Sequence, residues 1–116
     1  MTIEKGKLGE NLGVDYLIEM GFKIICRNYR TQYGEIDIVA EKNHVLFFVE
    51  VKFRKSIKFG SAREAITFKK RTHMKQAALM YLKCVKPLNN GFMISYLGVF
   101  LVRDVISFDF IENIYA

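Results

Sequence analysis

Two apolar segments separated by a short polar break constrain this chain more than any other feature of its sequence. Residues 34–40 read Gly-Glu-Ile-Asp-Ile-Val-Ala, and residues 45–53 read Val-Leu-Phe-Phe-Val-Glu-Val-Lys-Phe. Runs of β-branched and aromatic residues on either side of a turn are typical of a β-hairpin. A two-residue loop at Lys42-Asn43 or at Asn43-His44 gives the same pairing parity: odd positions of the first strand lie opposite even positions of the second.

The side-chain alternation of a strand divides these residues between the two faces of a sheet. One face is wholly apolar and requires a covering helix; it consists of Ile36, Ile38, Ala40, Val45, Phe47, Val49, Val51 and Phe53. The opposite face carries three acids and a lysine beside three apolar residues: Glu35, Asp37, Glu50 and Lys52, with Val39, Leu46 and Phe48. These apolar residues predict that the second face is also partly covered.

Three carboxylates on one face of a sheet repel one another and require a positive charge between them. Lys52 supplies one such charge. A divalent cation, Mg²⁺ or Mn²⁺, neutralises the cluster more completely, because Mg²⁺ is usually held by one or two carboxylates together with waters and phosphate oxygens. The cluster therefore predicts a metal-dependent phosphodiesterase. The alternative is that Asp37 and Glu50 are hydrophilic positions on a solvent-facing sheet.

The order of these residues resembles a nuclease signature. Asp37-x12-Glu50-Val51-Lys52 is similar to the D…(D/E)-x-K pattern of restriction-endonuclease-like nucleases, a superfamily that includes archaeal Holliday-junction resolvases. The fuller match, over most of the chain, is to the small bacterial YraN-like family of uncharacterised, nuclease-like proteins. The motifs that carry it are Gly6-x-x-Gly9-Glu10, Tyr16-Leu17, Gly21-Phe22, Arg27-Asn28-Tyr29-Arg30, Gly34-Glu35-Ile36-Asp37, Phe48-Val49-Glu50-Val51-Lys52-Phe53-Arg54, Lys69 and Ala78-x-x-Tyr81-Leu82. The chain departs from that family at residues 90–95, where the family usually has an Arg-Phe-Asp-like start to its last core strand.

The resemblance implies one restriction-endonuclease-like domain over residues 1–116, of the α/β (α+β) class. A central mixed β-sheet would be flanked by helices in the order α-β-β-β-α-β. By the same resemblance Asp37 and Glu50 are metal ligands, and the backbone carbonyl of Val51 is a further ligand. Glu10 would complete the acidic cluster, and Lys52 would be catalytic. Two alternatives stay open: Glu10 is an ordinary acid on a helix surface, and Lys52 only neutralises Glu50.

The remaining segments supply the flanking helices. Helical spacing predicts a first helix over residues 4–20, ended by Gly21, and a strand over residues 22–30 follows it. The buried face of this helix is predicted to consist of Leu8, Leu12, Tyr16 and Met20. After a basic loop at residues 55–60, the capping-box spacing of Ser61-Ala62-Arg63-Glu64 predicts a second helix, which Thr67 breaks or recaps. The buried face of the second helix is predicted to consist of Met74, Ala77, Ala78, Tyr81 and Leu82.

Residues 92–102 predict a strand that is apolar on both faces. This run is too short to span a bilayer, so no membrane association is expected. An exposed apolar strand invites pairing with a second chain, which predicts a homodimer, unless residues 105–115 fold back and cover the strand. Cys26 and Cys84 fit no metal-ligand spacing, and we expect both to be reduced, partly buried thiols in a cytoplasmic protein.

The charge distribution favours a polyanionic partner. The formal net charge is +6 and the pI is about 9.4. Residues 52–75 hold half of the 18 lysines and arginines against one acid, Glu64, although a solvated basic face would show the same pattern. Phosphate contacts are expected from Arg54, Lys55, Lys58, Lys69, Lys70 and Arg71. We therefore expect a Mg²⁺- or Mn²⁺-dependent nuclease acting on DNA rather than RNA, including branched or junction DNA, or else a non-catalytic nucleic-acid-binding protein that retains the fold.

Overall fold

The computed structural model describes residues 2–56 and 66–115, and these form a mixed α+β domain. In chain order the elements are α1 (Thr2–Glu19), β1 (Lys23–Thr31), β2 (Gly34–Lys42), β3 (Val45–Arg54), α2 (Phe68–Val85), β4 (Gly91–Val102) and β5 (Val105–Ile111). The order α-β-β-β-α-β predicted from the sequence is confirmed, and a further strand follows it. The predicted capping box at residues 61–64 lies outside the described residues.

All five strands belong to one sheet in the order β1-β2-β3-β4-β5. Neighbouring strands are antiparallel except for β3 and β4, which are parallel. Parallel neighbours require a long crossover connection, and α2 lies within that connection. Tight two-residue turns join the antiparallel pairs β2–β3 and β4–β5. At Asn43 and His44 φ is 53° and 64°, the left-handed backbone of a type I′ hairpin turn.

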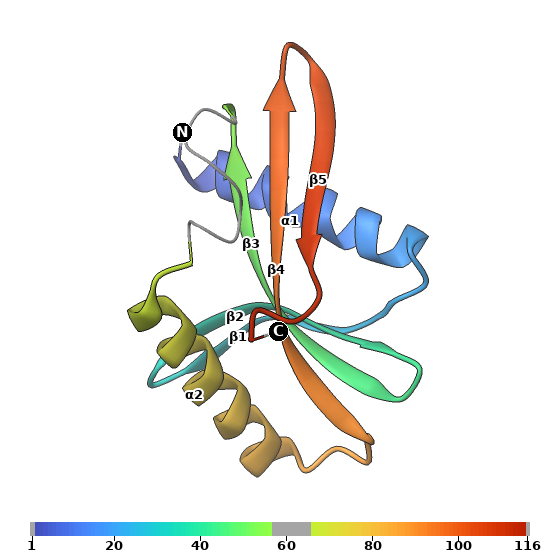
Figure 1. The fold of residues 1–116 in the computed structure, drawn as a ribbon, viewed down its shortest axis with the longest axis vertical. Helices are drawn as coiled ribbons and strands as arrows, with labels where there is room; N and C mark the ends of the chain where they lie inside the picture. The colour runs from blue at the N-terminus through green and yellow to red at the C-terminus, as the bar shows by residue number, and fades with distance from the viewer. Residues whose placement is uncertain (1, 57–65, 116) are drawn as a thin grey trace.

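The predicted pairing parity of the hairpin is confirmed. Val39 lies opposite Phe48, and Ile38 lies opposite Val49. The two faces of the sheet accordingly carry different apolar clusters, and a helix covers each of them (Figure 1). Residues Ile38, Ala40, Phe47 and Val49 pack on the α1 side with Leu17. Residues Val39, Leu46 and Phe48 pack on the α2 side with Ala77, Ala78 and Tyr81.

The alternation along β2 breaks at Asp37. Ile36 was expected beside Ile38, but it belongs to the cluster on the α2 side, whereas Ile38 belongs to the cluster on the α1 side. The described pairing of β2 with β3 also stops at Ile38. On β1, the other strand that pairs with β2, Asn28 has a φ of 54°, which is uncommon for a residue other than glycine. Both strands therefore twist sharply at this level, and simple strand periodicity does not anticipate such a twist.

Helix α1 approaches the sheet through glycines. A Cβ atom on Gly9 would lie 2.5 Å from Cβ of Phe53, and one on Gly13 would lie 3.1 Å from Cδ2 of Leu97. The buried stripe therefore runs through Gly9, Gly13 and Leu17. The prediction that Leu8 and Met20 are buried is wrong, because they flank this stripe and are 45% and 49% exposed.

Helix α2 begins where the sequence suggested a recap. The side-chain oxygen of Thr67 accepts a hydrogen bond from the backbone N–H of Lys70, the geometry of a helix N-cap. The predicted buried face is confirmed for Ala77, Ala78 and Tyr81. The ring of Tyr81 packs edge-on against Phe48, with ring centroids 5.3 Å apart, so this tyrosine belongs to the core.

Strand β4 is covered by the C-terminal segment. It pairs with β3 along one edge and with β5 along the other, and the backbone N–H of Ile114 donates to the carbonyl of Ile94. This is the folded-back arrangement that the sequence left as the alternative to a homodimer, so the argument for a dimer from an exposed β4 no longer holds.

The two cysteines differ in exposure. Both thiols are free; Cys26 is half-buried and Cys84 is exposed. The prediction that both are partly buried is therefore wrong for Cys84, which lies in the last, exposed turn of α2. Among the described residues, neither helix is long and apolar enough to cross a membrane.

Candidate functional site

The site is built around the twist at Asp37. Oδ2 of Asp37 accepts a hydrogen bond of 2.8 Å from the backbone N–H of Val51. A side chain thus contacts the neighbouring strand where the backbone pairing of β2 with β3 has ended. This bond holds the carboxyl group beside Glu50 and Val51, which are two residues that the sequence assigned to the same site.

The environment of Asp37 favours its protonated form. The pKa of Asp37 is raised from 3.8 to about 7. Burial is the largest cause, and the negative charge of Glu50 is the next largest. Glu10 and Glu35 add smaller contributions in the same direction, while the hydrogen bond from Val51 lowers the pKa. Strongly shifted carboxyl groups in the neighbourhood of other acids are a common property of functional sites, because a bound cation or substrate can relieve the repulsion.

Glu50 is paired with a lysine from α2. Nζ of Lys70 lies 2.7 Å from Oε1 of Glu50, whose side chain is only 15% exposed. Burial lowers the pKa of Lys70, but its hydrogen bond to Glu50 and the charges of Glu50 and Asp37 outweigh that effect and raise the pKa overall. The sequence predicts Lys70 on a phosphate-binding surface and gives no direct indication of this contact with Glu50. Helical spacing contained a signal for it, because Lys70 precedes the buried-face residue Met74 by four positions.

Lys52 occupies a different position. It follows Glu50 by two residues on β3 and is exposed. Among residues 6–56 and 66–115, whose side chains the structure describes, no ion pair joins Lys52 to a carboxylate, and the cation in contact with Glu50 is Lys70. In this structure Lys70, and not Lys52, therefore forms the ion pair with Glu50. The catalytic role of Lys52 stays a prediction.

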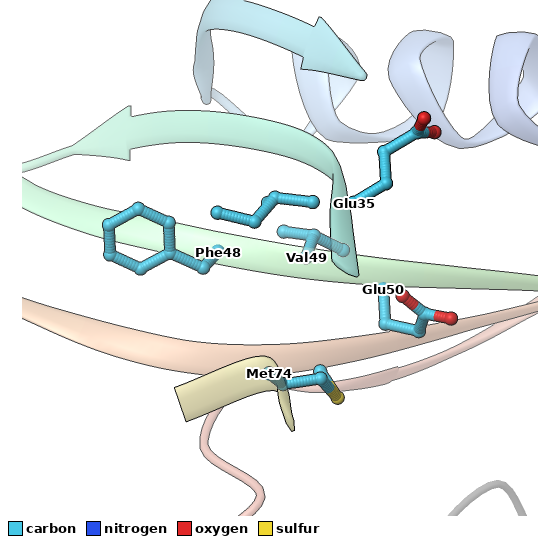
Figure 2. Close-up of a pocket in the computed structure, with 6 residues that line it drawn as sticks. Glu35, Phe48, Val49, Glu50 and Met74 are labelled. Carbon is cyan, nitrogen blue, oxygen red and sulfur yellow. The ribbon is translucent and has the colours of Figure 1, made fainter. Parts of the chain in front are cut away.

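Glu10 belongs to a neighbouring network rather than to direct contact with Glu50. Oε1 of Glu10 lies 3.0 Å from the guanidinium of Arg27. The side-chain amide of Asn28 donates to Glu10 at 2.9 Å and to Glu35 at 2.8 Å, so one amide bridges α1 and β2. In Figure 2 the carboxyl group of Glu35 points away from that of Glu50, toward a helix. The bridging role of Asn28 was missed, although Arg27-Asn28 is among the motifs quoted above.

The donor atoms fit a hard cation held by few protein ligands. Among the described residues, no three histidine, cysteine or acidic side chains are already gathered as a metal cage. Two carboxylates at Asp37 and Glu50, with waters and phosphate oxygens completing the shell, match the usual way in which Mg²⁺ is bound. A small cavity lies beside Glu50; it is lined by Glu35, Ile36, Phe48, Val49, Glu50 and Met74 (Figure 2).

The basic residues predicted to contact phosphate are spread around this site. Arg54 is half-buried and hydrogen-bonds to Tyr96, whereas Lys55 and Lys69 are exposed. Arg71 is half-buried next to Lys70 on α2. Lys58 lies outside the described residues.

The fold and the acidic site define a class. A mixed sheet with an antiparallel β1–β2–β3 meander, a helical crossover to a parallel β4, and Asp37 and Glu50-Val51-Lys52 on adjacent strands is that of a PD-(D/E)XK nuclease-like domain. Within this class the chain belongs to the family described as uncharacterised protein family UPF0102, whose model matches residues 9–112.

Several UPF0102 proteins are similar to this chain over most of its length. The protein of Caldicellulosiruptor saccharolyticus is 37% identical over 112 residues, which cover 95% of each chain. The protein of Syntrophomonas wolfei is 49% identical over 83 residues, which cover 72% of each chain. The protein of Clostridioides difficile is 47% identical over 79 residues, covering 68% of this chain and 69% of the relative.

Proposed function

We propose that this protein is a nuclease that uses Mg²⁺ or Mn²⁺ to hydrolyse phosphodiester bonds of DNA, with branched or junction DNA among its substrates. The observation that carries the proposal is the half-buried carboxyl group of Asp37, which lies beside Glu50 and among other acids at the end of the β2–β3 pairing. The hydrogen bond from Val51 only partly offsets the burial and the neighbouring charges that disfavour the carboxylate, and a bound cation would offset them further.

Each residue of the site has a distinct proposed role. Asp37 and Glu50, with the carbonyl of Val51, would hold the cation. When bound, the ion would polarise a phosphoryl oxygen and lower the pKa of a coordinated water. Lys52, exposed beside the site, would orient the attacking water, while Glu10 would act through the Asn28 amide as a positioning residue. The free thiols Cys26 and Cys84 fit a reducing cytoplasm, which is where we propose the activity to occur.

The test measures metal binding and cleavage separately. Calorimetric titration with Mn²⁺ should detect binding in the wild type, and Asp37→Asn combined with Glu50→Gln should abolish it. Cleavage of labelled duplex, flap, junction and single-stranded DNA should require Mn²⁺ or Mg²⁺. It should be lost in Lys52→Ala while DNA binding survives, because one lysine is a small part of a basic surface. Equal Mn²⁺ binding by the wild type and the double variant would refute the metal site.

One observation supports a second candidate, a nucleic-acid-binding protein without catalysis. The ammonium group of Lys70 already neutralises Glu50, with Nζ 2.7 Å from Oε1, so a metal ion bound at this oxygen would have to displace it. If this ion pair excludes metal, Lys70→Gln should restore Mn²⁺ binding that the wild type lacks. If the nuclease proposal holds, Lys70→Gln should only tighten existing Mn²⁺ binding, by roughly tenfold for about 1.4 kcal/mol of removed competition.

A further inference from the structure

A groove runs along one flank of α2, next to the C-terminal segment. It has a volume of about 610 Å³, and its lining includes Phe68, Arg71, Thr72, Lys75, Leu79 and Tyr115. The helical members recur every three or four positions, so they form one stripe along α2. This stripe is distinct from the one that packs on the sheet, which contains Ala77, Ala78 and Tyr81.

The groove exposes two aromatic rings. Phe68 is 79% exposed and Tyr115 is 48% exposed, so neither ring contributes its full area to the core. The ring of Tyr115 is nevertheless held in place. Its hydroxyl group donates to the backbone carbonyl of Arg71 at 3.0 Å, and Nζ of Lys75 lies 5.7 Å from its ring centroid. The groove therefore contains an exposed ring at Phe68 and a ring at Tyr115 that is held in place by its contacts with α2.

The same groove is positively charged. Helix α2 contains no acidic residue in its sequence. In the part of the chain that the structure describes, neither Arg71 nor Lys75 has a carboxylate within ion-pair distance. Exposed aromatic rings interleaved with cations are the combination that binds single-stranded nucleic acid, since bases stack on the rings and the cations meet phosphates.

The groove also adjoins the acidic site. Lys70 reaches Glu50, and the next residue, Arg71, lines the groove. The same turn of α2 therefore contributes one cation to the acidic site and the next cation to the groove.

We propose that this groove binds a single-stranded segment of the nucleic acid substrate, with a base stacked on Phe68 and the backbone phosphates at Arg71 and Lys75. The inference rests on the proposed nuclease function and adds a single-stranded segment to its substrate. A second copy of this chain is the competing occupant. A two-fold interface at this surface would bring Arg71 and Lys75 close to the same cations of the partner, which disfavours it.

The test uses binding in EDTA, so that it does not depend on cleavage. The chain contains no tryptophan, so Phe68→Trp introduces a single indole at the groove. Titration of this variant with a ten-nucleotide oligothymidylate should change the indole fluorescence, whereas a blunt duplex should change it little. Phe68→Ala should weaken oligothymidylate binding by about 5- to 150-fold, the factor expected for one stacked base at about 1–3 kcal/mol.

A matched variant and a salt series complete the design. Tyr33→Ala removes a ring that is 36% exposed at the β1–β2 turn, outside the groove, and should bind like the wild type. Arg71→Gln with Lys75→Gln should lower the slope of log affinity against log salt by about 0.7 per lost phosphate contact. Equal oligothymidylate affinities of Phe68→Ala and Tyr33→Ala would refute single-strand binding in this groove. The proposed nuclease function would still stand, because Mn²⁺-dependent cleavage is measured separately. A dimer in light scattering that Phe68→Ala dissociates would also overturn it, in favour of the second copy.

Discussion

At the scale of single residues, Asp37 combines a structural bond with an unfavourable charge. Its carboxyl group anchors Val51, yet burial and neighbouring acids raise its pKa to about 7. Because the folded-state pKa lies above the unfolded value, the native state binds more protons than the unfolded state between about pH 4 and pH 7. The free energy of unfolding should therefore fall as the pH rises through this window, in the absence of a divalent cation.

We predict that Asp37→Asn stabilises the metal-free protein above pH 7. The asparagine oxygen can still accept the hydrogen bond from Val51, but it carries no charge. The full shift would correspond to about 4 kcal/mol, and solvent screening of this half-buried carboxyl group reduces the expected gain to the order of 2 kcal/mol at pH 8. The gain should largely vanish near pH 4, where the wild-type carboxyl group is protonated. Urea denaturation in EDTA at pH 8 and pH 4 measures this difference in the free energy of unfolding between the variant and the wild type.

Asp15→Asn is the control for this prediction. Asp15 is an exposed acid on α1, and its neutralisation should change the free energy of unfolding little at either pH. An Asp37→Asn variant that is less stable than the wild type at pH 8 would mean that the carboxylate is satisfied in the native state without a cation.

At the scale of elements, the glycines of α1 determine how closely this helix lies on the sheet. Gly9 faces Phe53 at a distance that leaves no room for a methyl group, and Gly6, one turn earlier, has no atom within 4 Å of its virtual Cβ. The position of α1 determines where Glu10 meets Arg27 and Asn28. The packing of one glycine therefore supports the acidic network.

We predict opposite effects for two alanine substitutions in this helix. Gly9→Ala should destabilise the protein by about 1–3 kcal/mol, because Phe53 or the helix has to move. Gly6→Ala should stabilise it by about 0.5–1 kcal/mol, because alanine is the better helix former where space is free. Urea midpoints of the two variants decide the matter, and a stabilising shift in both would show that helix propensity, not packing, dominates at Gly9.

The elements also show which features the sequence could predict. The hairpin parity follows from periodicity alone, and the start of α2 at Thr67 follows from capping chemistry, so both were accessible. The transfer of Ile36 to the opposite cluster depends on a local twist at Asp37 and Asn28, which no periodic pattern encodes. The contact of Lys70 with Glu50 requires knowing how α2 lies over β3, and this is fixed by packing between distant segments.

At the scale of the whole molecule, β5 changes the expected assembly. It occupies the edge of β4 that the sequence left open, so the apolar run of residues 94–100 is buried within one chain. With that strand covered, we predict a monomer at micromolar concentration. Light scattering should give a mass near 13.5 kDa across a dilution series. A mass near twice that value would show that two chains associate through a surface other than β4.

The ion pair between Lys70 and Glu50 also bears on how two ligands would influence each other. A cation that takes Glu50 releases the ammonium group of Lys70, which is then free to meet a phosphate beside Arg71. Occupancy of the acidic site would thus strengthen the hold on a strand along α2. Thermodynamic linkage makes this effect reciprocal, so a bound strand would raise the affinity for the cation by the same factor. A protein of this design would bind its metal most tightly when nucleic acid is already present.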